Sequence, residues 1–339
     1  MLVLGDGPEV YVFSGVSDAP MWKQFCDGIL VGVGALRDRV ITLDSEGRLC
    51  TWRAVDGVKE DEVHIECRAP RQLRHSPDGI CLIVDRDEVI IADFRGGKRS
   101  VKFAGVSAAA FGGAQPAFGA GTRNGRFEAF GADGKPTGAC ELGAPVVGVA
   151  WRPQGQWAVA AGNVVSLVSA DGATVAAKLD AGGPITSVAV SAEGALIAAA
   201  VGNDVFIFEP LQGRRLGVVR VTRPVRGIAF GQASWLALGF EDAEANRVDL
   251  MTGQMCKTEA HPGRVASRWG IRVECDPMSV RSAVTQVRAG GQPIARQIEA
   301  EEGGRSCLWY LGILFVMFII CTGCTGLLSG GYWYYAYMR

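Results

Sequence analysis

Short apolar runs separated by tight turns fill the first 275 residues of the chain. The runs alternate apolar with polar positions or are apolar throughout, and many of their side chains are β-branched or aromatic, which is typical of strands. Clear examples are VITLD, ICLIVD, VIIADF, VVSLVS, VFIFEP and WLALGF. The pattern predicts many short strands, and the 46 glycines of the chain favour the same turn-rich, all-β fold.

Turn residues recur along this region with a period of about 39 residues. Glycines that close short turns follow one another at intervals of 37 to 42 residues, at Gly15, Gly57, Gly97, Gly134, Gly172, Gly213 and Gly253. Prolines that precede an alternating apolar run show the same spacing, at Pro145, Pro184, Pro224 and Pro262. A third register consists of the turns SPDG, RPQG and SAEG. Three registers with one period indicate a structural repeat.

Each period contains four strand-like runs, as a four-stranded antiparallel blade requires. One period reads PITSVAV, SAEG, ALIAAAV, GND, VFIFE, PLQG and RRLGVVR. Residues 1–275 therefore resemble the WD-repeat β-propellers: Trp52 keeps the aromatic side chain of the family's Trp-Asp position, and Asp93, Glu209 and Asp249 keep an acid there. The resemblance implies a ring of blades whose loops bind other proteins.

The seven turn glycines predict a seven-bladed ring, with six or eight blades as alternatives. The first blade has too few runs before its turn glycine for a complete sheet. We expect its missing first strand to come from residues 264–274 (RVASRWGIRVE), so that the two ends of the repeat region are spliced in one blade. Such a splice closes the ring and removes exposed sheet edges.

A different pattern begins after the repeats. Residues 276–306 carry mixed charge, a GG break and a proline, and they predict a juxtamembrane linker with room for one short helix. Residues 307–328 (CLWYLGILFVMFIICTGCTGLL) contain no charge, and as a helix they would extend about 33 Å, enough to cross a bilayer. A buried core helix is the alternative. The sequence thus predicts a β-propeller at 1–275, a linker at 276–306, a transmembrane helix at 307–328 and a short aromatic tail at 329–339.

The flanks of the predicted span indicate its orientation. Aromatic side chains bracket the span as they do at membrane interfaces, namely Trp309, Tyr310, Tyr332 and Trp333. Basic residues are more frequent before the span (Arg288, Arg296 and Arg305) than after it, where Arg339 stands alone. By the positive-inside rule the propeller stays on the cytoplasmic side, so we expect a single-pass, tail-anchored membrane protein.

Two features inside the span invite a chemical interpretation. The spacing of Cys321 and Cys324 is that of metal-binding or redox pairs, but in an apolar span we interpret these residues as small packing positions. Small residues recur every fourth position at Thr322, Gly326 and Gly330, a pattern that allows two membrane helices to associate.

Composition and motifs do not indicate catalysis. The 34 basic and 35 acidic residues balance, so no overall field favours nucleic acid. Ten cysteines are scattered, mostly in apolar runs, which indicates reduced, buried thiols. The three histidines (His64, His75 and His261) lie far apart, and we expect His75 to be a surface turn residue. No phosphate-binding loop, zinc-protease or EF-hand motif is present, and we predict no catalytic residue, no metal, no cofactor and no enzymatic activity.

Charged loops offer a more plausible site. In a propeller, the connections between blades and the turns between second and third strands lie on one face, and in this chain they carry Arg71, Arg123, Arg223, Arg264 and Asp242. Arginine is favoured at protein interfaces, so these residues predict a partner-binding face. The predicted function is a membrane-tethered protein-interaction scaffold. The alternatives are a nucleotide exchange factor for a small GTPase, by analogy of layout, and a ligand sensor or enzyme that uses the propeller channel.

Overall fold

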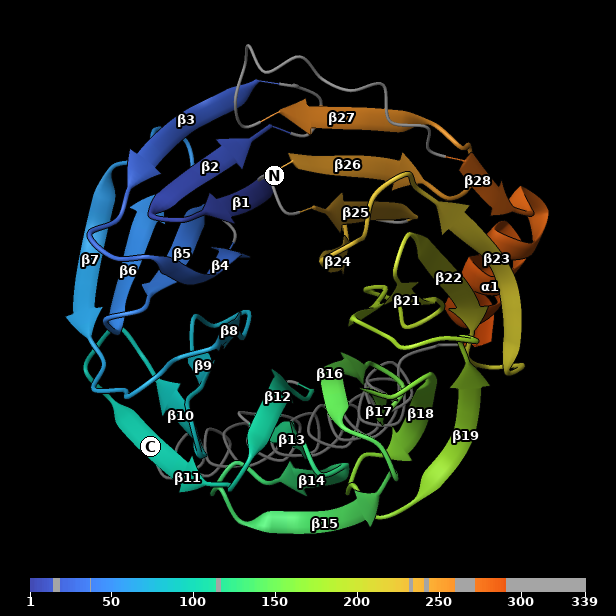
Figure 1. The fold of residues 1–339 in the computed structure, drawn as a ribbon, viewed down its shortest axis with the longest axis horizontal. Coiled ribbons are helices and arrows are strands. Elements are labelled where there is room, and N and C mark those ends of the chain that lie inside the picture. The colour runs from blue at the N-terminus through green and yellow to red at the C-terminus, as the bar shows by residue number, and fades with distance from the viewer. Residues whose placement is uncertain are drawn as a thin grey trace, which may run out of the picture. The chain divides into compact units, whose positions relative to one another are not determined.

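The computed structural model describes residues 1–14, 19–36, 38–113, 117–231, 234–240, 244–259 and 272–290. Within the compact unit Met1–Thr285, the strands form seven antiparallel sheets arranged as a ring (Figure 1). The all-β, seven-bladed propeller predicted from the repeat is confirmed, and rings of six or eight blades are excluded.

The blades are numbered in chain order. Blade 1 comprises β1 (Leu2–Asp6), β2 (Glu9–Phe13) and β3 (Pro20–Phe25). Blade 2 comprises β4 (Leu30–Leu36), β5 (Arg39–Asp44), β6 (Arg48–Arg53) and β7 (Lys59–His64). Blade 3 comprises β8 (Gln72–His75), β9 (Cys81–Val84), β10 (Glu88–Ala92) and β11 (Lys98–Lys102). Blade 4 comprises β12 (Val106–Phe111), β13 (Phe118–Thr122), β14 (Arg126–Phe130) and β15 (Pro136–Glu141).

The second half of the ring continues the pattern. Blade 5 comprises β16 (Val146–Arg152), β17 (Gln156–Ala161), β18 (Val164–Ser169) and β19 (Val175–Asp180). Blade 6 comprises β20 (Ser187–Val190), β21 (Ile197–Val201), β22 (Asp204–Glu209) and β23 (Arg214–Arg220), and it also pairs with β28 (Arg272–Cys275). Blade 7 comprises β24 (Gly227–Phe230), β25 (Trp235–Gly239), β26 (Glu244–Asp249) and β27 (Met255–Glu259).

The repeated Ala-Asp-Gly turn shows why the chain reverses where it does. Between β18 and β19, the Asp171 carboxylate accepts the backbone N–H of Ala173 at 3.0 Å, and Gly172 adopts a φ of 84° that side chains disfavour. A Cβ at Gly172 would also lie 2.8 Å from the carbonyl oxygen of Gly138 in the preceding blade. The glycine therefore permits both the turn and the close approach of the next sheet.

Most of the periodic glycines take this left-handed conformation. Positive φ angles occur at Gly57, Gly134, Gly172, Gly213 and Gly253. In the turn between third and fourth strands of blade 3, the glycine with positive φ is Gly96, one position before the glycine expected from the spacing. Gly15 lies outside the described residues. The repeat thus located the turns to within one residue.

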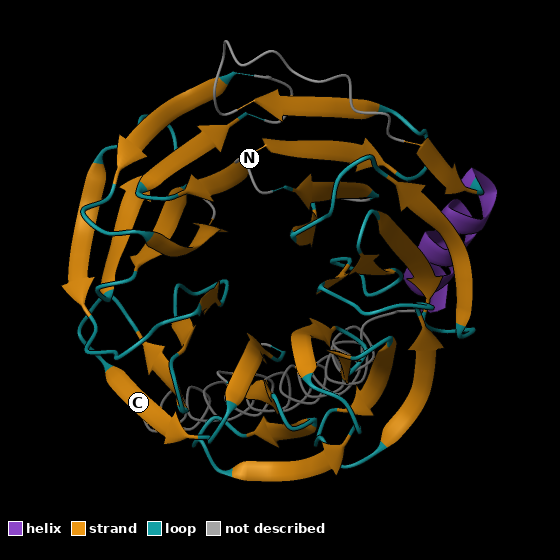
Figure 2. Cartoon of the chain, viewed as in Figure 1, coloured by secondary structure: helices purple, strands orange, loops and turns teal. Residues whose placement is uncertain are grey.

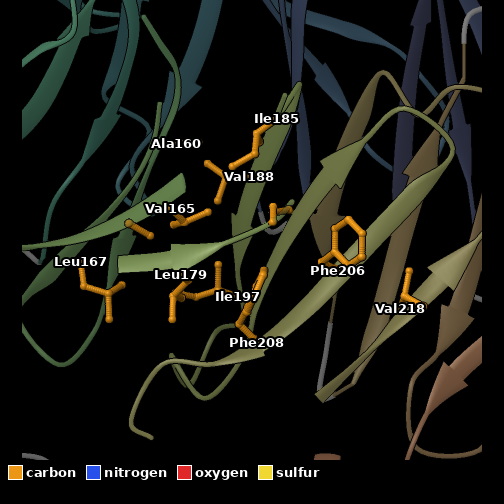
Figure 3. Packing of buried hydrophobic residues seen from close by; sticks show 13 residues of the cluster. Ala160, Val165, Leu167, Leu179, Ile185, Val188, Ile197, Phe206, Phe208 and Val218 are labelled. Atoms are coloured by element: carbon orange, nitrogen blue, oxygen red, sulfur yellow. The ribbon is translucent and has the colours of Figure 1, made fainter. Parts of the chain in front are cut away.

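Apolar side chains from facing sheets fill the space between neighbouring blades. Figure 3 shows one such cluster, in which Val165 and Leu167 of blade 5 pack with Ile197, Phe206 and Phe208 of blade 6. All five side chains are buried. Because such clusters join each neighbouring pair from blade 1 to blade 6, the stability of these sheets depends on the sheets beside them.

The structure contradicts part of the expected splice of the two ends. Residues 272–274, expected in blade 1, belong to β28, which pairs antiparallel with β23 at the edge of blade 6 and places Val273 opposite Val219. The rest of the predicted strand, residues 264–271, lies outside the described residues. Among the described strands blade 1 therefore contains three, in the order β1-β2-β3.

Helix α1 (Pro277–Gly290) occupies the first part of the predicted linker and is drawn in purple in Figure 2. Asp276 caps its N-terminus by accepting the backbone N–H groups of Met278 and Ser279, both at 3.1 Å. One face of the helix buries Val280, Ala283 and Val284. Helical spacing of these three residues explains why this segment, although its charge is mixed, folds as a helix.

No helix among the described residues is long and apolar enough to cross a membrane. The predicted span at 307–328 and the aromatic tail lie outside the described part of the chain.

Removal of Phe208 tests the inter-blade packing. Because its ring is buried between blades 5 and 6, Phe208→Ala is expected to lower the free energy of unfolding by about 3–5 kcal/mol. Denaturant unfolding of the purified chain measures the loss. Val147→Ala, at an exposed position of β16, serves as the control and is expected to change stability by less than about 0.5 kcal/mol. Equal losses would contradict the assigned packing.

Candidate interaction face

Hydrogen bonds between loops define one face of the ring. Arg123 lies in the turn between the second and third strands of blade 4, and Gly105 lies in the connection that leads into the first strand of that blade. The N–H of Arg123 donates to Gly105 O at 3.0 Å. In the connection from blade 5 to blade 6, the N–H of Ile185 donates at 2.8 Å to Gly162 O, in the turn between second and third strands of blade 5. In the connection from blade 6 to blade 7, the N–H of Val225 donates to Gly202 O, in the same turn of blade 6, at the same distance. The connections between blades and these turns thus lie at the same end of the strands. We call this end the loop face.

Three of the predicted partner-binding residues lie on the loop face. Arg71 precedes β8 and is exposed, and its N–H donates to Val84 O at 2.8 Å. Arg123 follows β13 and is exposed. Arg223 precedes β24, and its guanidinium stacks over the ring of Phe240, 6.0 Å from the centroid. The three arginines are therefore on the expected face, in the connections of different blades.

The remaining predicted site residues cannot be placed. Asp242 and Arg264 lie outside the described residues, as do the proposed membrane-interface residues (Trp309, Tyr310, Tyr332 and Trp333) and the small residues of the span (Thr322, Gly326 and Gly330).

The acids of the loop face have structural roles. Asp85 is buried, and its carboxylate accepts the N–H groups of Arg68 at 2.8 Å and Ala69 at 2.6 Å. Burial alone would raise the pKa of Asp85, but these two N–H groups and that of Arg86 hold the pKa below its usual value. Asp85 thus fixes the connection between blades 2 and 3.

His75 is not the surface turn residue that its sequence context suggested. It is the last residue of β8 and is half-buried, and burial lowers the pKa of its imidazole, with the charge of Arg74 as a lesser cause. A Cβ at Gly34 would lie 2.4 Å from the His75 ring, so the glycine of β4 makes room for it. His75 therefore belongs to the packing of blade 2 against blade 3.

A groove beside β1 escaped the sequence analysis. Two adjoining hollows of about 380 and 510 Å³ follow β1, and both are bordered by β1, β4 and β24. Val3 and Val33 line both hollows, and Ala35, Ala229 and Gly227 continue the apolar lining. No sequence signal marks this groove, because its lining residues are ordinary strand residues of three different blades.

The described thiols and acids offer no metal or redox centre. No cluster of three or more His, Cys, Asp or Glu side chains suitable for a metal ion occurs among the described residues. Burial raises the pKa of Cys50 and Cys81 to about 12 and that of Cys67 and Cys275 to about 11. These thiols are protonated at neutral pH, so they are poor nucleophiles and poor ligands.

Comparisons with known proteins leave the family open. No family model matches the chain, and no curated protein matches its sequence. The similarity to WD-repeat proteins is therefore one of architecture, that of a seven-bladed propeller.

Replacement of Asp85 tests its structural role. Asp85→Asn leaves buried N–H groups poorly paired and is expected to destabilise the chain by about 1–3 kcal/mol at pH 7. Because the folded-state pKa of Asp85 is lowered, the stabilisation is present above the unfolded-state pKa of about 3.9 and disappears as pH falls through the folded-state value. The free energies of unfolding of wild type and Asp85→Asn are therefore expected to converge as pH falls, which denaturant unfolding of both between pH 7 and pH 3 measures.

Asp78→Asn provides the control, because Asp78 is exposed in the SPDG turn. A pH-independent loss for Asp85→Asn, or an equal loss for Asp78→Asn, would contradict the assigned role.

Proposed function

We propose that the protein is a membrane-tethered interaction scaffold, in which a cytoplasmic β-propeller docks a partner protein at a membrane. The observation that carries the proposal is the loop face, where exposed arginines of separate blades project from connections that are themselves fixed by hydrogen bonds. A rigid face loses little conformational entropy on binding, and arginine is favoured at interfaces.

The electrostatics of the loop face favour an acidic partner surface. Asp85 is buried and occupied by backbone N–H groups, and Asp204 lies 3.9 Å from Arg220. Arg71 and Arg123, in contrast, are exposed. Exposed acids such as Asp87 also lie on this face, but a partner with carboxylates opposite Arg71 and Arg123 would pair with two accessible positive charges.

The membrane part of the proposal rests on the sequence of residues 307–328. This segment has no charged residue and has the length of a bilayer-spanning helix, and more basic residues precede it than follow it. A helix there would hold the propeller on the cytoplasmic side and raise the local concentration of its partner. The exchange-factor and enzyme alternatives gain no specific support from the described residues.

Charge reversal tests the docking face. The double variant Arg71→Glu, Arg123→Glu is expected to lose at least about 90% of the crosslinks to partner proteins, since each reversal replaces attraction with repulsion. Crosslinking mass spectrometry of the full chain in native membranes measures this. The matched control is Arg95→Glu, Lys135→Glu, which reverses two charges in turns between third and fourth strands, away from the loop face. Unchanged crosslinks in the first variant would contradict the proposed face.

Deletion of the span tests the tether. The chain without residues 307–328 is expected to move from the alkali-washed membrane fraction to the supernatant, because no other segment of the sequence has comparable length and hydrophobicity. Replacement of the span by an unrelated Leu/Ala segment of equal length is the matched control and is expected to restore membrane retention. Retention of the deleted form after the wash would refute the tether.

A further inference from the structure

Among the described strands blade 1 has only three, and the registers show which position of the blade none of them fills. In blades 2, 4, 5 and 6 the pair of third and fourth strands carries a register shift near the turn, as between Thr51 and Trp52, whereas no pair of second and third strands in blades 2 to 7 is shifted. In blade 1 the shift falls between Val12 and Phe13, in the β2–β3 pair, and the β1–β2 pair has none. Strands β1, β2 and β3 therefore correspond to the second, third and fourth strands of the other blades.

Hydrogen bonds of the connections agree with this assignment. The N–H of Leu30, just before blade 2, donates to Gly7 O at 2.7 Å in the β1–β2 turn. In blades 5 and 6 the equivalent bonds reach the turn between second and third strands. The vacant position is thus the innermost one, on the side of β1 that faces away from β2.

Burial confirms that the position is open. In β5, β9, β13, β17 and β21, the second strands of blades 2 to 6, nearly every residue is buried. None of the five residues of β1 is buried, and the same holds for β4 and β24, which flank the position. The hollows of about 380 and 510 Å³ lie between these three strands. We call this vacancy the inner-strand groove.

The edge of β1 that faces the groove can pair with another strand. In an antiparallel sheet alternate residues direct both backbone groups to the same side, so about half of the five residues of β1 point theirs into the groove. Most first strands of other blades, such as VSAAAF in β12 and SVAV in β20, consist largely of apolar and mostly small residues, with QLRH in β8 as the exception. An occupant would therefore be short, extended and rich in Ala, Val or Gly.

The chain between β27 and β28 is too short to be that occupant. It has twelve residues, 260–271, and the shortest connection to a first strand uses three, between Lys102 and Val106. The shortest first strands have four residues. After a connection of three residues and a strand of four, five of the twelve residues would remain for the return to β28, and these extend about 20 Å at most. The return to β28 must cover about four strand spacings, roughly 19 Å, and also pass blade 7. Occupation by this segment would require β28 to leave β23.

Charge also disfavours that segment. Among the described residues, the lining side chains that can carry charge are His75, Arg226 and Arg247, and none of these described lining residues is a carboxylate. Residues 260–271 contain Arg264, Arg268 and a histidine but no acid. The arginines of this segment would be repelled by Arg226 and Arg247, whereas a carboxylate on the occupant would be attracted to them.

We propose that the inner-strand groove binds an extended peptide segment of a partner protein, four to six residues long, with small apolar side chains and an acidic residue, which completes blade 1 by β-strand addition. The inference rests on the proposed function, because it specifies where and how the scaffold takes its partner. Main-chain pairing with β1 supplies affinity, and the size limit between β4 and β24 supplies selectivity.

Three synthetic peptides test the groove on the full chain. The first has the sequence Glu-Ala-Val-Ala-Val-Gly, the second replaces Glu with Lys, and the third has proline at alternate positions, which removes the N–H donors for pairing. Fluorescence anisotropy is expected to show saturable binding of the first peptide, at least about 10-fold weaker binding of the second at low salt, and none of the third.

A matched pair of variants ties the binding to the groove. Ala35 is exposed and lines the groove, so Ala35→Arg is expected to weaken binding of the first peptide at least about 10-fold with little effect on folding. Ala176→Arg, at an exposed position of β19, is expected to leave binding unchanged. Absence of saturable binding by the first peptide, or equal binding by the two variants, would overturn the proposal.

A photoreactive residue at position 2 distinguishes the two occupants. The proposal predicts a crosslink from this position to the added peptide, and a crosslink to residues 260–271 that the peptide does not displace would overturn it. If Ala35→Arg retains every partner crosslink in native membranes, the groove assignment fails and the scaffold proposal stands. If no partner is crosslinked to the wild-type chain, the scaffold proposal itself fails.

Discussion

Close approach of the innermost strands is the constraint on which the ring depends. Seven sheets converge on one centre, where first strands of neighbouring blades approach closely. A Cβ at Gly32 of β4 would lie 2.6 Å from the Cβ of Leu73 in β8, and one at Gly148 of β16 would lie 2.8 Å from a methyl carbon of Val188 in β20. Such distances leave no space for a larger side chain, so the Ala- and Gly-rich sequence of these strands follows from the geometry of the ring.

The same constraint gives the open position in blade 1 its meaning. Where the innermost strands are complete, the second strands behind them are buried, as in β17 and β21. In blade 1, where none of the described strands fills the innermost position, β1, β4 and β24 have no buried residue, and one edge of β1 faces the groove. Edges of this kind pair readily with other chains, and proteins usually cover them. A groove that accepts one narrow strand turns this liability into a means of recognition.

The repeat in the sequence predicted the architecture because turn chemistry is local. A glycine such as Gly172 is needed where the backbone of the turn has a positive φ, whatever the rest of the fold is. Because each four-stranded blade has one turn between its third and fourth strands, the number of regularly spaced glycines predicts the number of blades. Pairing between distant strands is not local: the apolar pattern of residues 272–274 predicts a strand, but it does not say whether β1 or β23 is the partner.

The candidate site was predictable in part for the same reason. Arg71 and Arg123 could be assigned to the loop face, because their positions between strands follow from the repeat. The structural role of Asp85 could not be predicted, because the sequence does not show whether the side chain of a turn aspartate faces solvent or accepts buried N–H groups. The groove beside β1 could not be predicted, because β24, which closes it against β1 and β4, lies far from both in the sequence.

Hydrogen exchange of the β1 backbone tests most directly whether blade 1 is completed by a partner segment. Amides of Leu2–Asp6 that face the groove are expected to exchange much faster than those of β17 in the free full-length chain. They are expected to become protected when the acidic Ala/Val peptide is added, while β17 stays unchanged. Amides of β1 that are already as slow as those of β17 in the free chain would contradict the account.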